Sequence, residues 1–264
     1  MRFSIWLKME EPWDDLLGSA LHAERTGWDG IWVADHFMPN GARSDRPRLE
    51  AWTTIAGVGA RVPRVRIGVL VTGNTYRHPA VLAKMAATVD HICEGRLVLG
   101  LGAGWQVNEH EAYGIGLPSV PDRLARLDEA CQVIRMLHSQ QRSHFAGRFY
   151  RLVDAPCEPK PLQQPLPLLV GGSGEKVTMR IAALYADEWN CWGLPGLIAH
   201  KTEVLEQHCL DTGRDPASIQ RSAQALVYMS DDTEQLGAWR SEVSTMPRII
   251  GTPAQIGEVL AQYV

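Results

Sequence analysis

The 264-residue sequence lacks the charge patterns and long apolar runs that mark several other classes of protein. Its net charge is −4, and its densest basic stretch, with Arg43, Arg46 and Arg48, is diluted by acidic neighbours. Such a stretch is typical of a solvated loop, so the charge pattern argues against a nucleic-acid partner and against a membrane anchor. No apolar run approaches the ~20 residues that a membrane span needs.

Cysteine is scarce, and its spacing argues against two kinds of stabilising site. The five cysteines are odd in number, and no pair has the C-x-x-C spacing. We therefore expect neither a disulfide framework nor a zinc site, and no histidines and carboxylates fall at a recognisable metal spacing. The N-terminal residues form a strand-like run without a charged leader, so no signal peptide is predicted. Together these features favour a metal-free protein of the reducing cytoplasm.

What the sequence does contain is a regular alternation of short apolar runs and amphipathic stretches. The apolar runs predict strands at residues 2–9, 30–36, 65–72, 97–101, 168–170, 188–192 and 222–229. Helical spacing predicts helices at residues 12–26, 49–61, 79–92, 122–137, 175–185, 197–212 and 254–263. Strands that alternate with helices predict a parallel α/β fold, and this length with seven strands favours a (β/α)8 TIM barrel.

Two parts of the chain depart from this rhythm. Residues 105–165 contain a helix and a hairpin-like stretch, residues 144–152, that turns at Gly147. We interpret them as an insertion after the fourth strand and not as a separate domain. The predicted strands also leave the barrel one β/α unit short. We therefore expect a single domain over residues 1–264 whose last β/α unit is incomplete.

A glycine cluster follows the fifth predicted strand, at the end where barrel enzymes place their active sites. It consists of Gly171, Gly172, Ser173 and Gly174, and a helix is predicted to begin near Glu175. Glycines let a ligand approach the backbone, and the N-terminus of a helix favours an anion. A plain strand-to-helix turn is the alternative. The position at a strand end favours a phosphate site, although the spacing matches neither a P-loop nor a Rossmann motif.

Polar and aromatic residues at two other strand ends are further candidates. His36 follows Asp35 at the end of the second strand. A histidine titrates near neutral pH, so it can transfer a proton or donate a hydrogen bond to a cofactor. The alternative is a structural histidine bonded to the backbone. After the fourth strand, Trp105 follows the small residues Ala103 and Gly104, and it either walls a pocket for a flat ring or packs beneath the insertion.

Five segments, in this order along the chain, resemble the bacterial luciferase-like monooxygenase superfamily. The resemblance is greatest to the branch of that superfamily that uses the deazaflavin coenzyme F420. The segments are GWDGIWVADHF (residues 27–37), residues 72–105, EHEAYG (residues 109–114), residues 147–163 and VGGSGEKVTMRIAALYADEWN (residues 170–190). They span nearly the whole chain, and the ordered set is more specific than any one segment.

The resemblance implies a barrel with a flavin-like ring at its C-terminal mouth, a phosphate held by Gly171, Gly172, Ser173 and Gly174, and a homodimer. The ring would lie near His36 and against the third strand around Val69 and Leu70, where the family often carries a non-prolyl cis peptide bond. The other implied cofactor contacts are Thr72, Asn74, Ala103, Gly104 and Trp105. The sugar-phosphate dehydrogenases of this branch have a tryptophan and a glutamate where this chain has Asn40 and Trp105, so their substrate is not carried over.

The resemblance implies an oxidoreductase that transfers a hydride between coenzyme F420 and a small organic substrate. The catalytic residues would be His36, as a ring contact or proton donor, and Asp35, which would orient it. An FMN-dependent monooxygenase on the same barrel is the alternative. A flavin-binding protein without turnover is an alternative of another class, motivated by the incomplete last unit.

Overall fold

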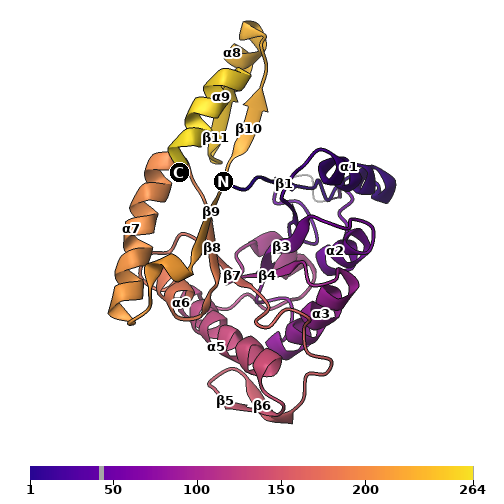
Figure 1. Ribbon diagram of the computed structural model, residues 1–264, viewed down its shortest axis with the longest axis vertical. Coiled ribbons are helices and arrows are strands. Elements are labelled where there is room, and N and C mark those ends of the chain that lie inside the picture. The colour runs from indigo at the N-terminus through magenta and orange to yellow at the C-terminus, as the bar shows by residue number, and fades with distance from the viewer. Residues whose placement is uncertain (42–44, 264) are drawn as a thin grey trace. The chain divides into compact units, whose positions relative to one another are not determined.

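The computed structural model describes residues 1–41 and 45–263. Arg43, which belongs to the basic stretch interpreted as a solvated loop, lies outside the described residues. The chain folds into two compact units, residues 2–169 and residues 170–264, called here the N-terminal unit and the C-terminal unit (Figure 1). Whether the two act as the single predicted domain stays a prediction.

Parallel strands form the sheet of the N-terminal unit in the order in which they occur in the chain. They are β1 (Ser4–Trp6), β2 (Gly30–Val33), β3 (Arg66–Gly73) and β4 (Leu97–Gly102). Strands β3 and β4 are almost entirely buried, as expected for near-continuous apolar runs that are covered on both faces. The chain returns to this sheet at Pro167, whose carbonyl accepts a hydrogen bond from Leu99 N–H at 2.9 Å.

Helices connect and cover these strands, and their first turns explain where they begin. The N-terminal unit contains α1 (Trp13–Arg25), α2 (Ala51–Gly59), α3 (Pro79–Ile92), α4 (Val107–Ala112) and α5 (Val120–Ser139). The Glu50 carboxylate accepts the N–H groups of Trp52 and Thr53 at the start of α2, and Ser119 caps α5. Pro79 occupies the first turn of α3, where its missing N–H costs least.

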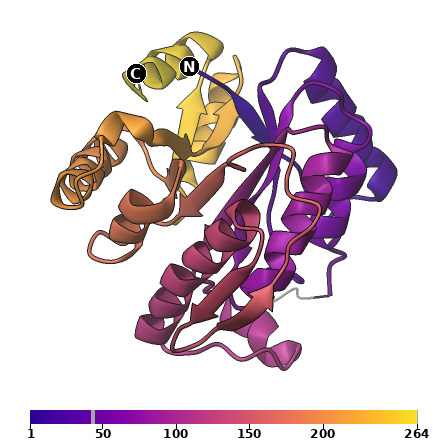
Figure 2. The same ribbon diagram turned by 60° about the horizontal axis from the view of Figure 1, so that its bottom comes forward.

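The predicted insertion contains the expected hairpin, with β5 (Ser143–Ala146) antiparallel to β6 (Arg151–Ala155). Figure 2 shows the hairpin beside α5. The Glu129 carboxylate of α5 accepts hydrogen bonds from the N–H groups of Arg148, Phe149 and Tyr150 at 2.7, 3.0 and 3.0 Å. These bonds fasten the turn of the hairpin to the helix. The sequence did not predict the short helix α4 at the start of this segment.

The C-terminal unit continues the β/α alternation. Strand β7 (Leu168–Gly171) leads into it, followed by α6 (Thr178–Tyr185), β8 (Glu188–Trp192), α7 (Pro195–Asp211) and β9 (Gln220–Gln224), and β8 and β9 are parallel. The next segment contains β10 (Leu226–Met229), α8 (Thr233–Ser241), β11 (Arg248–Gly251) and α9 (Pro253–Leu260). Short 3₁₀ turns lie at Pro216–Ser218 and Ala261–Tyr263.

The last part of the C-terminal unit corrects the strand count predicted from the sequence. Residues 222–229 were predicted as one strand, but β9 and β10 separate at Ala225, and β10 pairs in parallel with β11 in a sheet of its own. Neither β11 nor α8 was predicted. Strand β11 holds only the apolar pair Ile249 and Ile250 between Pro247 and Gly251, which is too short a run to stand out. In this part of the chain the structure therefore adds two strands and a helix to the predicted series.

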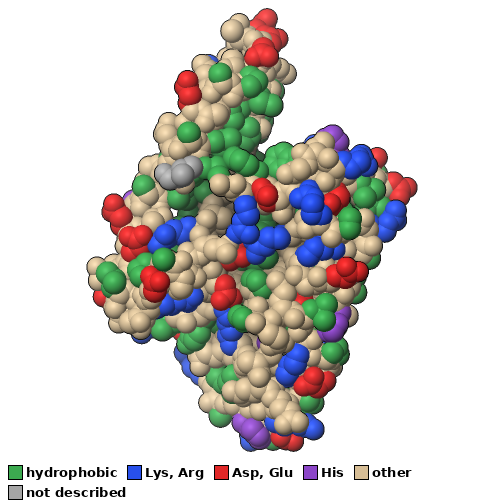
Figure 3. All heavy atoms as spheres, viewed as in Figure 1, with side chains coloured by type: hydrophobic (Ala, Val, Ile, Leu, Met, Phe, Trp, Pro, Cys, Tyr) green, Lys and Arg blue, Asp and Glu red, His purple; other side chains and the backbone are tan. Residues whose placement is uncertain are grey.

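The surface carries charges of both signs, and the thiols lie in the interior. Figure 3 shows acidic and basic side chains interspersed on the face that it presents. The five cysteines, all within the described residues, are buried and unpaired. Among residues 1–41 and 45–263, no helix is both long and apolar enough to cross a membrane, and no three His, Cys, Asp or Glu side chains gather as a metal site would require.

Candidate functional site

Strand β3 carries the backbone feature that the resemblance predicted. A cis peptide bond joins Leu70 and Val71, which confirms the expected non-prolyl cis bond around Val69 and Leu70. Val69 is fully buried, and Leu70 packs against Val98 and Leu169. These residues form an apolar layer beneath the end of the strand.

Beyond this layer, Thr72 and Asn74 have different surroundings. The Thr72 hydroxyl is buried and accepts a hydrogen bond from the indole N–H of Trp52 at 3.1 Å. The side-chain amide of Asn74 donates to the Tyr150 hydroxyl at 3.2 Å, while its Oδ1 is buried and has no hydrogen-bond partner among the described residues. An unsatisfied buried acceptor costs about 1–3 kcal/mol. Asn74 Oδ1 is therefore placed to accept a hydrogen bond from a ligand.

His36 lies after β2, and its ring is held by a buried carboxylate. His36 Nδ1–H donates to Glu109 Oε1 at 2.7 Å, and the N–H of Phe37 donates to the other carboxylate oxygen at 2.7 Å. The Tyr76 hydroxyl donates to Glu109 as well. The Glu109 side chain is 0% exposed, and that of His36 is 21% exposed. Burial raises the pKa of Glu109, but these hydrogen bonds outweigh burial and lower that pKa below its ordinary value.

Asp35 does not orient His36 as the sequence suggested. Its carboxylate forms a two-pronged ion pair with Arg77, with nitrogen–oxygen distances of 2.6 and 3.1 Å. Arg77 also donates to Glu50, the residue that caps α2. Asp35 and His36 are therefore neighbours in the chain that face different partners. The prediction that Asp35 orients His36 is corrected: Glu109 does so.

Trp105 lies beside His36 and not beneath the insertion. The two rings meet edge to face, with centroids 5.5 Å apart and an interplanar angle of 80°, and Trp105 is 57% exposed. Gly104 before it has φ 82°, and a Cβ there would lie 2.6 Å from Thr75 Oγ1. This position therefore requires glycine. Ala103 is half-buried and Asn40 is exposed.

The glycine cluster lies in the C-terminal unit and forms a longer loop than predicted. Gly172 has φ 136°, its N–H donates to Asn190 O at 2.9 Å, and its carbonyl accepts from the Trp189 indole at 2.9 Å. Helix α6 begins at Thr178 and not near Glu175, so its N-terminus does not directly follow the glycines. The predicted helix start is therefore wrong by three residues, because residues 175–177 form a turn.

A lysine from helix α7 contacts this loop. Lys201 Nζ donates to the carbonyl of Ser173 at 3.0 Å and to the Glu175 carboxylate at 2.6 Å. His200 lies 3.0 Å from the same carboxylate, and the bonds from Lys201 and His200 lower the pKa of Glu175. Ser173 and Gly174 themselves are exposed. The loop therefore combines an accessible backbone with a cation that sequence reasoning missed.

In the N-terminal unit the candidate side chains follow the C-terminal ends of parallel strands, which is the arrangement of enzymes of the α/β-barrel class. The sequence model of the luciferase-like monooxygenase family matches residues 1–256. The chain belongs to this family.

Curated relatives carry the names of F420-dependent enzymes. A protein of Kineococcus radiotolerans named F420-dependent glucose-6-phosphate dehydrogenase is 33% identical over 221 residues, which cover 82% of this chain and 64% of the relative. A protein of the same name from Amycolatopsis mediterranei is 36% identical over 193 residues, with 72% of this chain and 57% of the relative covered. The chain spans about three-fifths of the length of the curated relatives it matches.

Solved structures share the fold. An F420-dependent secondary alcohol dehydrogenase in complex with an F420-acetone adduct matches with a TM-score of 0.89 at 22% identity, covering 99% of this chain and 89% of that one. The EDTA monooxygenase of Chelativorans sp. BNC1 matches with a TM-score of 0.84 at 15% identity, covering 100% of this chain and 85% of that one. The chain therefore has the luciferase-like TIM-barrel fold.

Proposed function

We propose that this protein is an F420-dependent oxidoreductase that transfers a hydride between the deazaflavin and a small organic substrate. The observation that carries the proposal is the His36–Glu109 pair at 2.7 Å, a geometry that supports proton transfer by His36. The names of the curated relatives supply the cofactor class. Alcohols are the substrates we favour, because removal of a hydride from an alcohol requires a base for its hydroxyl proton.

Each unit, taken by itself, has residues whose chemistry suits one part of a deazaflavin with a phosphate. Asn74 Oδ1 is an unpartnered acceptor among the described residues and suits an N–H group of the ring. Around it, the proposed ring contacts are His36, Val69, Leu70, Thr72, Ala103, Gly104 and Trp105. The proposed phosphate contacts are Gly171, Gly172, Ser173 and Gly174, with Lys201 as a counter-charge. When bound, the deazaflavin supplies the hydride acceptor.

The chain's own contribution is to hold the substrate and to move its proton. His36 would accept the hydroxyl proton, and Glu109 would stabilise the imidazolium that results. Trp105 would shield this exchange from water on one side, since its ring meets that of His36 edge to face. Asp35 would act at a distance, by fixing Arg77 and the loop after β3.

An anaerobic turnover assay tests the proposed activity. The full chain is incubated with oxidised F420 and, in turn, primary alcohols, secondary alcohols and glucose 6-phosphate. We expect at least one alcohol to bleach the visible absorbance of the deazaflavin in proportion to the carbonyl product. If F420 binds and no substrate bleaches it, the protein is a cofactor carrier. If FMN supports oxygen consumption in place of F420, it is a monooxygenase.

Replacing Lys201 with alanine should weaken the binding of phosphate-bearing cofactor. A hydrogen bond to a charged group contributes about 1.5–3 kcal/mol, so we expect F420 to bind roughly 10–100-fold more weakly. The deazaflavin chromophore without its phosphate should bind the variant and the wild type alike. Fluorescence titration measures both affinities, and Gln207→Ala, on an exposed part of α7, is the control. An equal loss of affinity for both ligands would show that Lys201 does not contact the phosphate.

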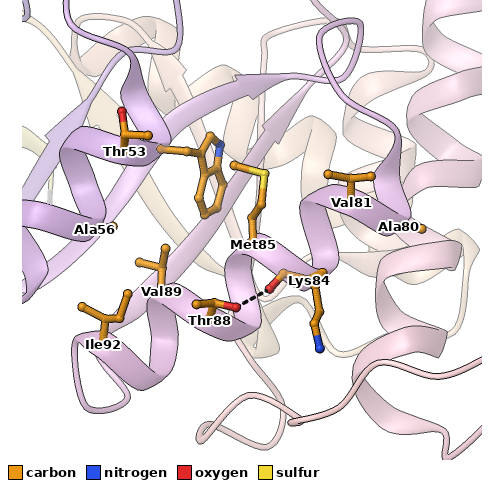
Figure 4. A pocket seen from close by; sticks show the side chains of 10 residues that line it. Thr53, Ala56, Ala80, Val81, Lys84, Met85, Thr88, Val89 and Ile92 are labelled. Atoms are coloured by element: carbon orange, nitrogen blue, oxygen red, sulfur yellow. Dashed lines mark hydrogen bonds between the residues drawn. The ribbon is translucent and has the colours of Figure 1, made fainter.

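We also propose that two copies of the chain form a homodimer through the apolar groove between α2 and α3. Figure 4 shows its lining residues, which are Trp52, Thr53, Ala56, Ala80, Val81, Lys84, Met85, Thr88, Val89 and Ile92. The single charged side chain of this set, Lys84, donates to the backbone carbonyl of Glu158. Val81 and Ile92 are 54% and 42% exposed. A second copy presents the same surface, so a two-fold pairing brings together apolar and uncharged polar side chains, with Lys84 of each copy held by its own backbone carbonyl.

Val81→Glu should therefore shift the protein toward a monomer, because it places a carboxylate that must lose its hydration in a mainly apolar interface. We expect the molar mass measured by light scattering after size exclusion to fall from twice the chain mass to the chain mass. Val153→Glu is the matched control, since Val153 is 66% exposed on β6, outside the groove. A wild type that is monomeric at micromolar concentration, or a dimer that survives Val81→Glu, would contradict this interface.

The thiols favour a reducing compartment. The five cysteines, all in the described part of the chain, are buried and unpaired. Burial raises the pKa of Cys131 to about 12 and that of Cys191 to about 11, which keeps both in the thiol form. Because free thiols are typical of proteins in the cytosol, we propose a cytoplasmic location.

A further inference from the structure

The Glu109 carboxylate receives its hydrogen bonds from groups that come from separate parts of the N-terminal unit. Helix α4 presents the carboxylate, the chain after β2 supplies His36 and the N–H of Phe37, and the chain after β3 supplies Tyr76. An ionised carboxylate can only accept hydrogen bonds. The lowered pKa of Glu109 keeps it ionised at neutral pH. Each group that contacts the Glu109 carboxylate must therefore donate a hydrogen bond to it. This requirement applies to the imidazole of His36.

A neutral imidazole has one N–H group and one lone pair, and the partner of one nitrogen determines the role of the other. His36 Nδ1 lies 2.7 Å from Glu109 Oε1, so the proton of the neutral ring is on Nδ1 and the lone pair is on Nε2. We infer that Glu109 is a positioning residue that fixes His36 in its Nδ1–H tautomer and so presents Nε2 as the acceptor of the substrate's hydroxyl proton. The inference rests on the proposed function for the identity of the substrate, but the tautomer itself does not.

The surroundings hold this arrangement rigidly. Gln106 Nε2 donates to the carbonyl of Met38 at 2.9 Å, and Asn108 Nδ2 donates to that of Pro39 at 3.0 Å. These bonds fasten the start of α4 to the chain that follows His36. The ring of Tyr76 stacks on His110, with centroids 4.9 Å apart. These contacts connect the segments that carry the carboxylate and the imidazole. They favour the fixed geometry that a proton transfer requires.

The groups around His36 include one carboxylate in direct contact with its ring. Glu109 is in direct contact with it, and Asp35 precedes it in the chain with its charge paired to Arg77. Burial and the neighbouring Glu109 raise the pKa of Tyr76, so Tyr76 stays a neutral donor. Trp105, whose ring contacts that of His36, is uncharged. The imidazolium would therefore form beside a carboxylate that is already in place.

The proton and the electrons balance with His36 in this role. When bound, the deazaflavin would supply the acceptor for the hydride, which would leave the substrate carbon with the electron pair of the C–H bond. The O–H electrons form the second bond of the carbonyl, and the hydroxyl proton goes to His36 Nε2. His36 later returns this proton to solvent. The reverse reaction uses the same groups in the opposite order.

The tautomer is measured directly by nitrogen NMR on the full chain labelled with ¹⁵N-histidine and free of cofactor. His36→Asn assigns the His36 signals by difference. In the wild type, above the pH at which the ring titrates, we expect Nδ1 protonated and Nε2 with the shift of an unprotonated nitrogen. In Glu109→Gln, whose amide can donate, we expect a substantial population of the opposite tautomer. A wild-type His36 protonated on Nε2, or an unchanged tautomer in Glu109→Gln, would overturn the inference.

Kinetics supply a second readout. In serine-protease triads the loss of the orienting carboxylate costs about 10⁴-fold in rate. For Glu109→Gln we expect kcat to fall by about 10²–10³-fold with KM nearly unchanged, because the imidazole keeps its place but loses its fixed tautomer. Tyr76→Phe, which keeps the carboxylate, should lower kcat by less than tenfold. If Glu109→Gln does not fold, the NMR tautomer of the wild type and the kcat of Tyr76→Phe still test the inference. The NMR result stands even if F420 proves to be the wrong cofactor.

Discussion

Replacing His36 with alanine should lower the rate of hydride transfer by about 10²–10⁴-fold, the range over which a general base contributes. The alcohol cannot give up its hydride readily while it keeps its hydroxyl proton. The fold should survive, because the His36 side chain is 21% exposed and Glu109 keeps its bonds from Phe37 and Tyr76. The measurement is kcat and kcat/KM under anaerobic conditions, together with the midpoint of urea unfolding.

His144→Ala is the control for this variant, because His144 is 68% exposed on β5 and should change neither rate nor stability. The binding constant for F420 separates two roles of His36. A loss of rate with binding kept within about tenfold supports the proton-transfer role, whereas a loss of binding alone makes His36 a cofactor contact. A variant with wild-type kcat would contradict the proposed mechanism.

The second large effect is on stability. Arg77→Met should destabilise the fold by about 3–5 kcal/mol, the cost of leaving one partner of a buried ion pair without its counter-charge. Asp35 is 2% exposed, and the Arg77 guanidinium bonds to it at 2.6 and 3.1 Å. Methionine fills much of the arginine's volume without its charge. Urea unfolding at pH 7 measures the change, and Asp35→Asn combined with Arg77→Met should recover a large part of it.

This loss should depend on pH in a defined direction. Burial raises the pKa of Asp35, and Arg77 offsets part of that rise. Without Arg77 the folded-state pKa rises further above the unfolded value of about 3.9. An acid with a raised pKa in the folded state binds more protons there than in the unfolded state. The destabilisation caused by the unpaired Asp35 charge is therefore absent below about pH 4 and grows as the pH rises through the folded-state pKa. The variant should therefore approach the wild type as the pH falls from 7 to 5. A pH-independent difference would show that Asp35 keeps its charge or that packing dominates.

Much of the fold could be predicted because its strong signals are local. The apolar run that forms β3 and the proline that starts α3 each mark their element within a few residues. The elements that were missed have weak local signals. Helix α4 spans six residues and buries Glu109 and His110, whose polarity is typical of a loop. Strand β11 has only two apolar residues between breakers.

The site was predictable in part, for the same reason. His36 and the glycine cluster were proposed from their positions at strand ends, and their roles stay predictions. Glu109 and Lys201 could not, because each acts on a partner that is distant in the chain. Glu109 lies 73 residues from His36, and Lys201 lies 28 residues from Ser173. For Asp35 the error was the reverse, because its place beside His36 in the sequence suggested that the two interact. Its carboxylate forms an ion pair with Arg77 instead, 42 residues away in the chain.

The measurement that tests the central proposal most directly is equilibrium binding of F420 and of FMN to the full chain. It requires no knowledge of the substrate. The account predicts saturable binding of F420, followed by its fluorescence, with FMN binding at least about tenfold more weakly. Tight binding of FMN without binding of F420 would contradict the account.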